Sequence, residues 1–243
     1  MIRIVDVHMR FKAPVLRGVS LEVPAGCIYA LIGPGASGKS VLLKTVAGLL
    51  KPERGHVEVD GDNVSAMDEV ALMSVRKKVG MLFQNYALFD LTVGENIGFP
   101  LRRLFDMPEA EVAERIAERL ERVALPGIEN RIPASLSGGQ KKRVGVARAT
   151  IATPPIVLYD EPTAGLDPVT SQKIYNLVRD EQRARDATVR VISSDVAGVL
   201  TIADRVGMLH KGRLIFDGTV EEARRSTIPE VDQFVHGKTE GPL

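Results

Sequence analysis

The hydrophobic pattern of this chain contains two kinds of expected strand. Residues 2–11 and 19–23 alternate between apolar and polar positions, which predicts two strands near the N-terminus. Further on, several apolar runs have the length of a strand without such alternation. They are Ile28–Ile32, 57–59, Val79–Phe83, Ile156–Tyr159, Thr188–Ser193 and Arg205–Leu209. The run at 57–59 precedes the turn Asp60-Gly61, and Arg205–Leu209 is expected to pair with 213–216 across the turn Lys211-Gly212.

Helical spacing separates these strand-like runs. Apolar residues recur at that spacing after Gly38, and again over Glu109–Ala124, where Glu and Arg cover the opposite face. A further helix is expected after Gly138-Gly139. Residues 86–101 are rich in apolar residues but keep neither period, so they either pack locally or form an exposed patch that docks a partner. The alternation of strands and helices predicts an α/β fold with a largely parallel sheet.

Composition limits the class of protein. With 243 residues the chain is one large domain, or one domain with an inserted subdomain. Its single cysteine, Cys27, excludes an internal disulfide framework and fits a reducing cytosol. The 32 basic and 31 acidic residues nearly cancel, which argues against broad electrostatic binding to nucleic acid. No apolar run approaches the roughly 20 residues that span a bilayer, and Asp6 and His8 stand where a signal peptide needs an apolar region.

The segment GPGASGKS at 33–40 follows an expected strand and precedes an expected helix, which is the context of a phosphate-binding P-loop. Gly33 and Gly38 let the backbone approach a phosphate closely, and successive N–H groups with the helix dipole then favour the anion. Lys39 supplies a positive charge for the β- and γ-phosphates, and the Ser40 hydroxyl is a ligand for Mg²⁺. The alternative is a glycine-rich turn that binds nothing.

Polar residues at the ends of other strands add candidate chemistry. Asp160 is expected to assist in holding Mg²⁺, and Glu161 to act as general base for a hydrolytic water. Gln84 is either an ordinary loop residue or a contact to metal or water. Ser137 begins a helix suited either to an anion or to simple N-capping. Phe11 belongs to the core or stacks on a base, and periodicity alone favours the core.

Together these stretches resemble the ATP-binding subunits of ABC transporters. The resemblance covers nearly the whole chain and rests on GPGASGKS, Gln84, LSGGQ at Leu136–Gln140, IVLYDE at Ile156–Glu161 and GLD at Gly165–Asp167. It implies a P-loop NTPase fold with an N-terminal antiparallel β region, a helical subdomain inserted at 85–150 and a tail at 227–243. It also implies a head-to-tail dimer in which the LSGGQ segment of one copy covers the γ-phosphate held by the other.

The resemblance assigns roles to residues, with ATP and Mg²⁺ as cofactors. Glu161, Gln84 and Ser194 occupy the catalytic positions, and Ser40, Gln84 and Asp160 those around the metal. Gln84 would also link Mg²⁺ to the membrane partner. Contacts to the nucleotide are expected from Phe11, Gly33, Pro34, Gly35, Ala36, Ser37, Gly38, Lys39, Ser40, Val41, Ser137, Gly138, Gly139, Gln140 and Asp167.

A narrower resemblance is to the phospholipid-transport branch of the family, whose subunits work with an MlaE-type permease and MCE-domain lipid binders. It rests on GKSVLLK, the ALFD segment, LYDEPTAGLDPVT and the tail PEVDQFVHGKTEGP. It implies a peripheral position on the cytoplasmic face of the inner membrane and no nucleic-acid partner. The expected permease-facing residues are Leu88, Phe89, Leu91 and Phe99. The tail either frays or anchors through Val231 and Phe234 on the second copy or a small accessory subunit.

Three departures from the family pattern stand out. Ala36 replaces a common glycine, and the segment after Asp90 is about one residue short. Ser194 stands where the family has a histidine, and His210 lies beyond the next strand, so no nearby histidine is expected to substitute. This favours a second hypothesis, a nucleotide-dependent dimerisation switch that barely hydrolyses ATP. An importer subunit for another small solute is also possible, and so is a soluble ATPase acting on DNA or ribosomes, although near-neutral charge argues against the latter.

Overall fold

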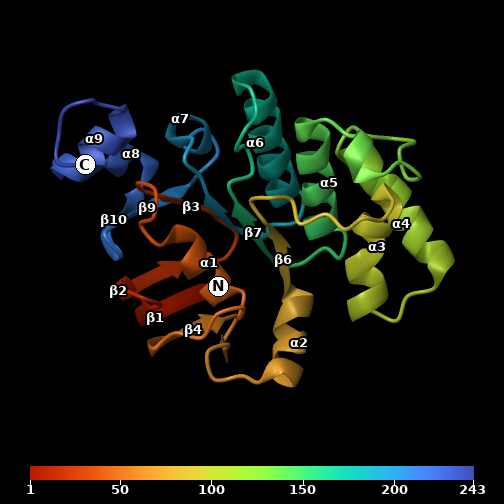
Figure 1. The fold of residues 1–243 in the computed structure, drawn as a ribbon, viewed down its shortest axis with the longest axis horizontal. Coiled ribbons are helices and arrows are strands. Elements are labelled where there is room, and N and C mark those ends of the chain that lie inside the picture. Colours follow the sequence, from red (N-terminus) through yellow and green to blue (C-terminus); the bar gives the residue numbers. More distant parts are fainter.

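The computed structural model describes residues 1–243, which form two β-sheets and the helices that pack on them (Figure 1). The smaller sheet is antiparallel, with strands in the order β2-β1-β4-β5. Ile2 and Ile4 alternate into the core, and an irregularity in the pairing between Ile4 and Val7 lets Val7 and Met9 point the same way. The bounds are β1 Ile2–Arg10, β2 Pro14–Val23, β4 Arg54–Val59 and β5 Asp62–Asn63.

The larger sheet has six strands in the order β10-β9-β3-β8-β7-β6. All neighbours pair in parallel except β10 and β9, which form the expected hairpin. Parallel strands end at one edge, so the residues after β3, β8, β7 and β6 are brought together there. The bounds are β3 Ile28–Ile32, β6 Val79–Leu82, β7 Ile156–Asp160, β8 Thr188–Ile192, β9 Arg205–His210 and β10 Arg213–Thr219.

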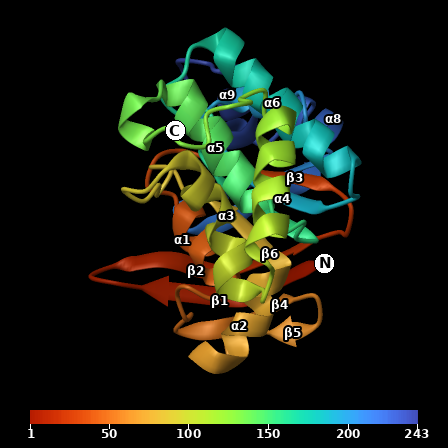
Figure 2. The same cartoon turned by 90° about the vertical axis from the view of Figure 1, so that its right-hand side faces the viewer.

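The helices complete three apolar cores. One core fills the space between the two sheets with α1 and α2, a second lies on the other face of the larger sheet, and a third joins α3, α4 and α5. Figure 1 places these last three helices at the opposite end of the molecule from α8 and α9, and Figure 2 turns α3, α4 and α5 toward the viewer. None of the helices combines the length and apolarity needed to cross a bilayer. The helices are α1 Lys39–Val46, α2 Glu69–Lys78, α3 Val93–Leu104, α4 Glu109–Arg122, α5 Gly138–Thr150, α6 Pro168–Arg183, α7 Val196–Val199, α8 Val220–Arg224 and α9 Pro229–His236, with a 3-10 turn at Pro133–Ser135.

The structure corrects two expectations about local structure. Residues 86–101 include most of a helix, α3, which a capping box between Thr92 and Glu95 starts. The interpretation of the tail as a frayed end is also wrong, because α9 forms there and Val231 is fully buried in the chain's own second core. Val231 is therefore not free to anchor on another copy, whereas Phe234 is only partly buried.

Arg190, in the middle of the larger sheet, lowers the stability of the fold. It lies on β8 between Tyr29 of β3 and Leu158 of β7, is fully buried, and none of its three side-chain nitrogens has a hydrogen-bond partner. Burial lowers the pKa of Arg190 to about 10. Below that pH the guanidinium is charged in both folded and unfolded chains, so its desolvation opposes folding across the neutral range.

We expect Arg190→Met to raise the free energy of unfolding at neutral pH by on the order of 3 kcal/mol, since each unit of pKa shift corresponds to about 1.4 kcal/mol. The gain should be constant up to about pH 10 and then shrink, because the folded chain loses the proton first. Chemical denaturation followed by circular dichroism measures it. Arg213→Met, an exposed change on β10, should leave stability nearly unchanged. A stability loss in Arg190→Met would contradict the prediction.

Candidate functional site

The loop between β3 and α1 is shaped to hold an anion. A Cβ at Gly33 would lie 2.1 Å from the Leu209 carbonyl oxygen, so only glycine fits there, and its φ is +140°. The Ser37 hydroxyl is buried beside Gly33 without a hydrogen-bond partner. No side chain caps the first turn of α1, whose N-cap is Gly38. A buried hydroxyl without a partner and an uncapped helix start both fit a phosphate group.

Lys39 closes this loop in the ligand-free chain. It is 8% exposed, and its Nζ donates to the carbonyl oxygens of Gly33 at 2.7 Å and Pro34 at 2.9 Å. Burial lowers the pKa of Lys39, an effect that Glu161 and Asp160 oppose. Ala36 adopts a left-handed φ of +58°. Glycine adopts this conformation without steric cost, so alanine here costs about 1 kcal/mol.

Ser40 and Asp160 come together across the sheet edge. The Ser40 hydroxyl donates to Asp160 Oδ1 at 3.0 Å, and Asp160 is 3% exposed. Burial raises the pKa of Asp160, and the hydrogen bond from Ser40 opposes that rise. No group of three or more carboxylate, histidine or cysteine side chains is arranged to hold a metal. A hydroxyl beside one carboxylate instead suits Mg²⁺ held mainly by phosphates and water.

Glu161 is fixed next to Ser194 at the same edge. Ser194 donates to Glu161 Oε2 from its backbone N–H at 2.8 Å and from its hydroxyl at 2.9 Å. The buried Tyr175 hydroxyl joins the two loops, because it lies 3.0 Å from Thr163 Oγ1 and 2.8 Å from Ser193 Oγ. The structure thus brings the two candidate catalytic residues into direct contact, and it adds Tyr175, which the sequence pattern did not single out.

A hollow of about 490 Å³ opens beside Ser194. The other wall is formed by α9 and the end of the chain, including Phe234 and His236. The Gln233 amide holds this end in place, since it donates to the Lys238 carbonyl at 3.3 Å and accepts from Leu243 N at 2.9 Å. His236 lines the same hollow, and its Nδ1 lies 3.0 Å from the Asp232 carboxylate, so the expectation that no nearby histidine substitutes for the one missing at Ser194 stays a prediction.

Three further expected site residues lie elsewhere in this single chain. Phe11 is 56% exposed after β1, so the interpretation of Phe11 as a core residue is wrong. The other interpretation, in which its ring stacks on a nucleotide base, is compatible with this exposure. The side chain of Gln84 is exposed in the turn after β6, and it takes no part in the hydrogen bond between Ser40 and Asp160. The Ser137 hydroxyl accepts from Gln140 N at 3.3 Å, as a simple N-cap.

Asp167 likewise caps a helix. Its Oδ1 accepts from Thr170 N at 2.9 Å at the start of α6, and hydrogen bonding with the Thr170 side chain, followed by that with its backbone N–H, lowers the pKa of Asp167. Of the LSGGQ glycines at the start of α5, Gly138 is exposed and Gly139 partly exposed, whereas Leu136 is buried in the third core. Within one chain Asp167 and these glycines therefore lie at or near the surface, and none of them is hydrogen-bonded to the loop at 33–40.

The ABC transporter family model matches residues 16–164, which include the phosphate loop, the LSGGQ segment and both carboxylates. The chain belongs to the ABC transporter family. The dimeric ATP-binding cassette MJ0796 in a post-hydrolysis state with ADP and Pi superimposes with a TM-score of 0.85 at 31% identity, covering 90% of this chain and 99% of that chain. The expected α/β fold of an ABC cassette, with a mostly parallel sheet and an antiparallel sheet, is confirmed.

Two curated relatives of this cassette carry different substrate names. The methionine import ATP-binding protein MetN of Caulobacter vibrioides is 44% identical over 210 residues, which are 86% of this chain and 63% of the relative. The intermembrane phospholipid transport system ATP-binding protein MlaF of Escherichia coli K12 is 36% identical over 230 residues, which are 94% of this chain and 86% of the relative. The chain therefore spans less than two thirds of the methionine relative.

Proposed function

We propose that this cassette is the ATP-binding and ATP-hydrolysing subunit of a transporter that moves phospholipid in the bacterial envelope, at the cytoplasmic face of the inner membrane. The observation that carries the hydrolytic part is the convergence of Lys39, Ser40, Asp160 and Glu161 at one sheet edge. The phosphates of ATP would lie on the loop at 33–40, and Lys39 would leave its two loop carbonyls for the β- and γ-phosphates. Glu161 would polarise the attacking water.

Mg²⁺ would be held by the Ser40 hydroxyl and the Asp160 carboxylate, and when bound it would neutralise developing charge on the phosphates. The adenine base would stack on the exposed ring of Phe11. A second copy would supply Ser137 and its glycines over the γ-phosphate. The exposed LSGGQ edge supports that arrangement, as does the dimeric state named for the similar cassette.

The phospholipid assignment rests on how much of each chain is matched. The phospholipid relative matches larger shares of both chains than the methionine relative does, although its identity is lower. The matched region of that relative also extends over most of its own length, so few parts lie outside the comparison. The proposal implies an MlaE-like permease, an MCE-domain lipid binder and a small accessory subunit as partners.

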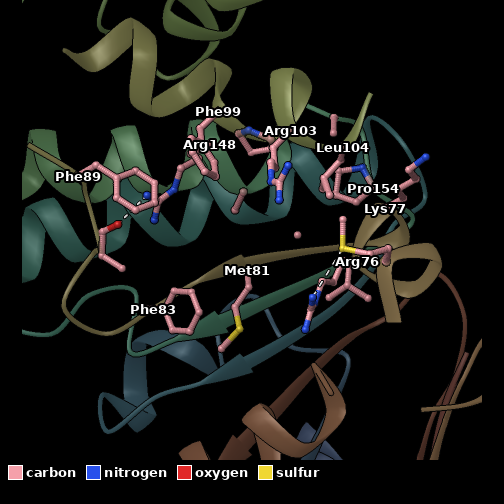
Figure 3. Close-up of a pocket in the computed structure, with 17 residues that line it drawn as sticks. Arg76, Lys77, Met81, Phe83, Phe89, Phe99, Arg103, Leu104, Arg148 and Pro154 are labelled. Carbon is pink, nitrogen blue, oxygen red and sulfur yellow. Dashed lines mark hydrogen bonds between the residues drawn. The ribbon is translucent and has the colours of Figure 1, made fainter. Parts of the chain in front are cut away.

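A hollow of about 450 Å³ between α2, β6, α3 and α5 is the proposed permease-docking site (Figure 3). Phe89 is 44% exposed and Phe99 41% exposed, with ring centres 4.8 Å apart. Leu91 is also exposed, whereas Leu88 packs against the third core. Basic side chains line the hollow beside the apolar ones, which suits an apolar helix with an acidic residue. They are Arg76, Lys77, Arg103 and Arg148.

We expect Phe89→Glu to weaken association with the permease about 10- to 30-fold, because a buried aromatic anchor contributes about 2 kcal/mol. ATP affinity should stay unchanged, since Phe89 lies away from the phosphate loop. Co-purification and surface-plasmon measurements with the detergent-solubilised permease test this. Leu49→Glu, an equally exposed apolar position outside the hollow, is the matched control. Equal binding by wild type and Phe89→Glu would move the docking surface elsewhere.

The transported substrate is decided by reconstitution. The cassette would be purified with the membrane protein that accompanies it and placed in vesicles that contain labelled phospholipid or labelled methionine. We expect ATP-dependent movement of phospholipid, absent in Glu161→Gln. Movement of methionine alone would replace the phospholipid proposal with that of a small-solute importer. No hydrolysis under any condition would favour the second candidate below.

The second candidate is a nucleotide-dependent dimerisation switch. Ser194 favours it, because its hydroxyl donates to Glu161 Oε2 and its side chain is shorter than the histidine expected at this position. Under this proposal ATP would drive dimer formation with little turnover. Light scattering with ATP and with ADP, measured beside phosphate release, separates the two candidates.

A further inference from the structure

Lys142 is a buried cation that no carboxylate pairs with. It lies in the second turn of α5 and is fully buried. Its Nζ donates to the carbonyl oxygens of Gln84 at 2.9 Å and Glu161 at 2.8 Å. The same nitrogen lies 4.6 Å from the centre of the Tyr86 ring. An ammonium group has three donors, so two carbonyls and one aromatic face satisfy Lys142 completely.

The hydrogen bond from Lys142 reaches Glu161, a residue whose backbone is strained. Glu161 has a left-handed φ of +50°, a conformation that costs a non-glycine residue about 1–3 kcal/mol. Its N–H donates to the Ile192 carbonyl at 2.9 Å, and its own carbonyl accepts from Lys142 at 2.8 Å and from Ala164 N–H at 3.3 Å. The backbone is therefore held on both sides of the Cα that carries the carboxylate. Without Lys142, the Glu161 carbonyl keeps only the longer hydrogen bond from Ala164 N–H at 3.3 Å, so this side of the residue is held less firmly in its strained conformation.

A second buried cation from the same helix holds the turn after β6. Arg148 donates to the Tyr86 carbonyl at 2.6 Å and the Ala87 carbonyl at 2.7 Å. Tyr86 and Ala87 also have left-handed φ values, +60° and +48°. The Arg148 guanidinium lies 5.6 Å from the centre of the Phe89 ring, in the proposed docking hollow (Figure 3). Helix α5 therefore holds the turn after β6 through hydrogen bonds and also forms one wall of the hollow.

We propose that Lys142 is a positioning residue that ties Glu161 and the turn at 84–87 to α5. Arg148 and Lys142 act on the same turn from one rigid helix. A permease helix seated against Phe89 and Arg148 would shift that helix, and Lys142 would carry the shift to Glu161. This inference rests on the proposed hydrolytic function for its effect on turnover, but its effect on the loops belongs to the ligand-free chain.

Lys142→Met tests the proposal, because methionine fills a similar volume without donors. We expect turnover to fall about 10- to 100-fold, as for groups in other enzymes that orient a reacting residue, while ATP affinity changes less than about twofold. In the ligand-free protein, hydrogen exchange should rise at the amides of 84–88 and 161–164 but not in β3 or β7. Lys142→Arg should restore most of the turnover and slow the exchange. Lys141→Met, the same charge change one residue earlier, should match wild type.

Several results would overturn the proposal. One is unchanged hydrogen exchange at both loops in Lys142→Met. Another is a parallel loss of turnover and ATP affinity with a lower melting temperature, which marks a purely structural role. A third is an equal effect from Lys141→Met. If wild type itself does not hydrolyse ATP, the hydrolytic function fails instead, and the exchange measurement alone decides whether Lys142 fixes the two loops.

Discussion

Ser194→His should raise steady-state ATP turnover roughly 10²- to 10³-fold at little-changed ATP affinity. A preorganised donor to developing charge typically contributes that much, about 2.7–4 kcal/mol. An imidazole reaches further than a hydroxyl, and the hollow of about 490 Å³ beside Ser194 has room for the ring. The Glu161 carboxylate would lose the Ser194 hydroxyl but keep the backbone N–H at 2.8 Å. The general base therefore stays in place while the missing donor is added.

Phosphate release and nucleotide titration should be measured together on three variants. Ser194→Ala removes the hydroxyl without adding a ring, so it isolates the effect of freeing Glu161, which we expect to be small. His236→Gln asks whether the histidine from α9 already acts beside Ser194. Rapid turnover in wild type that Ser194→His fails to improve would contradict the prediction. A large loss in His236→Gln would then identify the group that fills the role.

Lys39→Ala should weaken ATP binding about 10²- to 10³-fold. Charge-assisted hydrogen bonds contribute about 1.5–3 kcal/mol each, and the amine can reach two phosphates. The buried position of Lys39 keeps water from replacing that charge. Part of the loss has another source, because the alanine also frees the Gly33 and Pro34 carbonyls that the amine holds before ATP arrives.

Isothermal titration with ATP and with ADP measures this loss of affinity and separates the part that depends on the γ-phosphate from the rest. The amine reaches the γ-phosphate only in ATP, so the affinity for ATP should fall more than the affinity for ADP. Lys51→Ala, an exposed change beyond α1, is the control for charge alone. Unchanged ATP affinity in Lys39→Ala would show that the loop at 33–40 does not bind phosphate in the proposed way.

Local patterns predicted the elements that depend on local sequence. The strand and loop around Gly33, the strand before Asp160 and the amphipathic helix at 109–122 all form where the pattern indicates. Helix α3 was missed because Gly98 and Pro100 are poor helix formers, although Val93, Ile97 and Leu101 keep helical spacing. Gly98 is there for packing, since a Cβ would lie 2.9 Å from the Ile116 side chain of α4. The Thr92-to-Glu95 capping box was the readable signal.

The residues that the sequence did not reveal act across long separations. Tyr175 reaches Thr163 and Ser193 only because α6 packs on the larger sheet, and no local pattern encodes that contact. Lys142 did leave a trace, because it occupies the same face of α5 as buried Val146 and Ala149. A lysine on a buried face needs partners, so that mismatch marks a tertiary contact. Phe11 shows the reverse, an aromatic residue left exposed where periodicity favours burial.

The strand order of the larger sheet also sets when this protein can fold during its synthesis. Strand β3 is made early, but both of its neighbours, β8 and β9, are made in the last quarter of the chain. Such parallel pairings between distant segments form slowly. Until β8 leaves the ribosome, the wholly apolar β3 has no partner and the loop at 33–40 has no fixed shape. A nascent chain at that stage is exposed to aggregation, and nucleotide cannot assist its early folding.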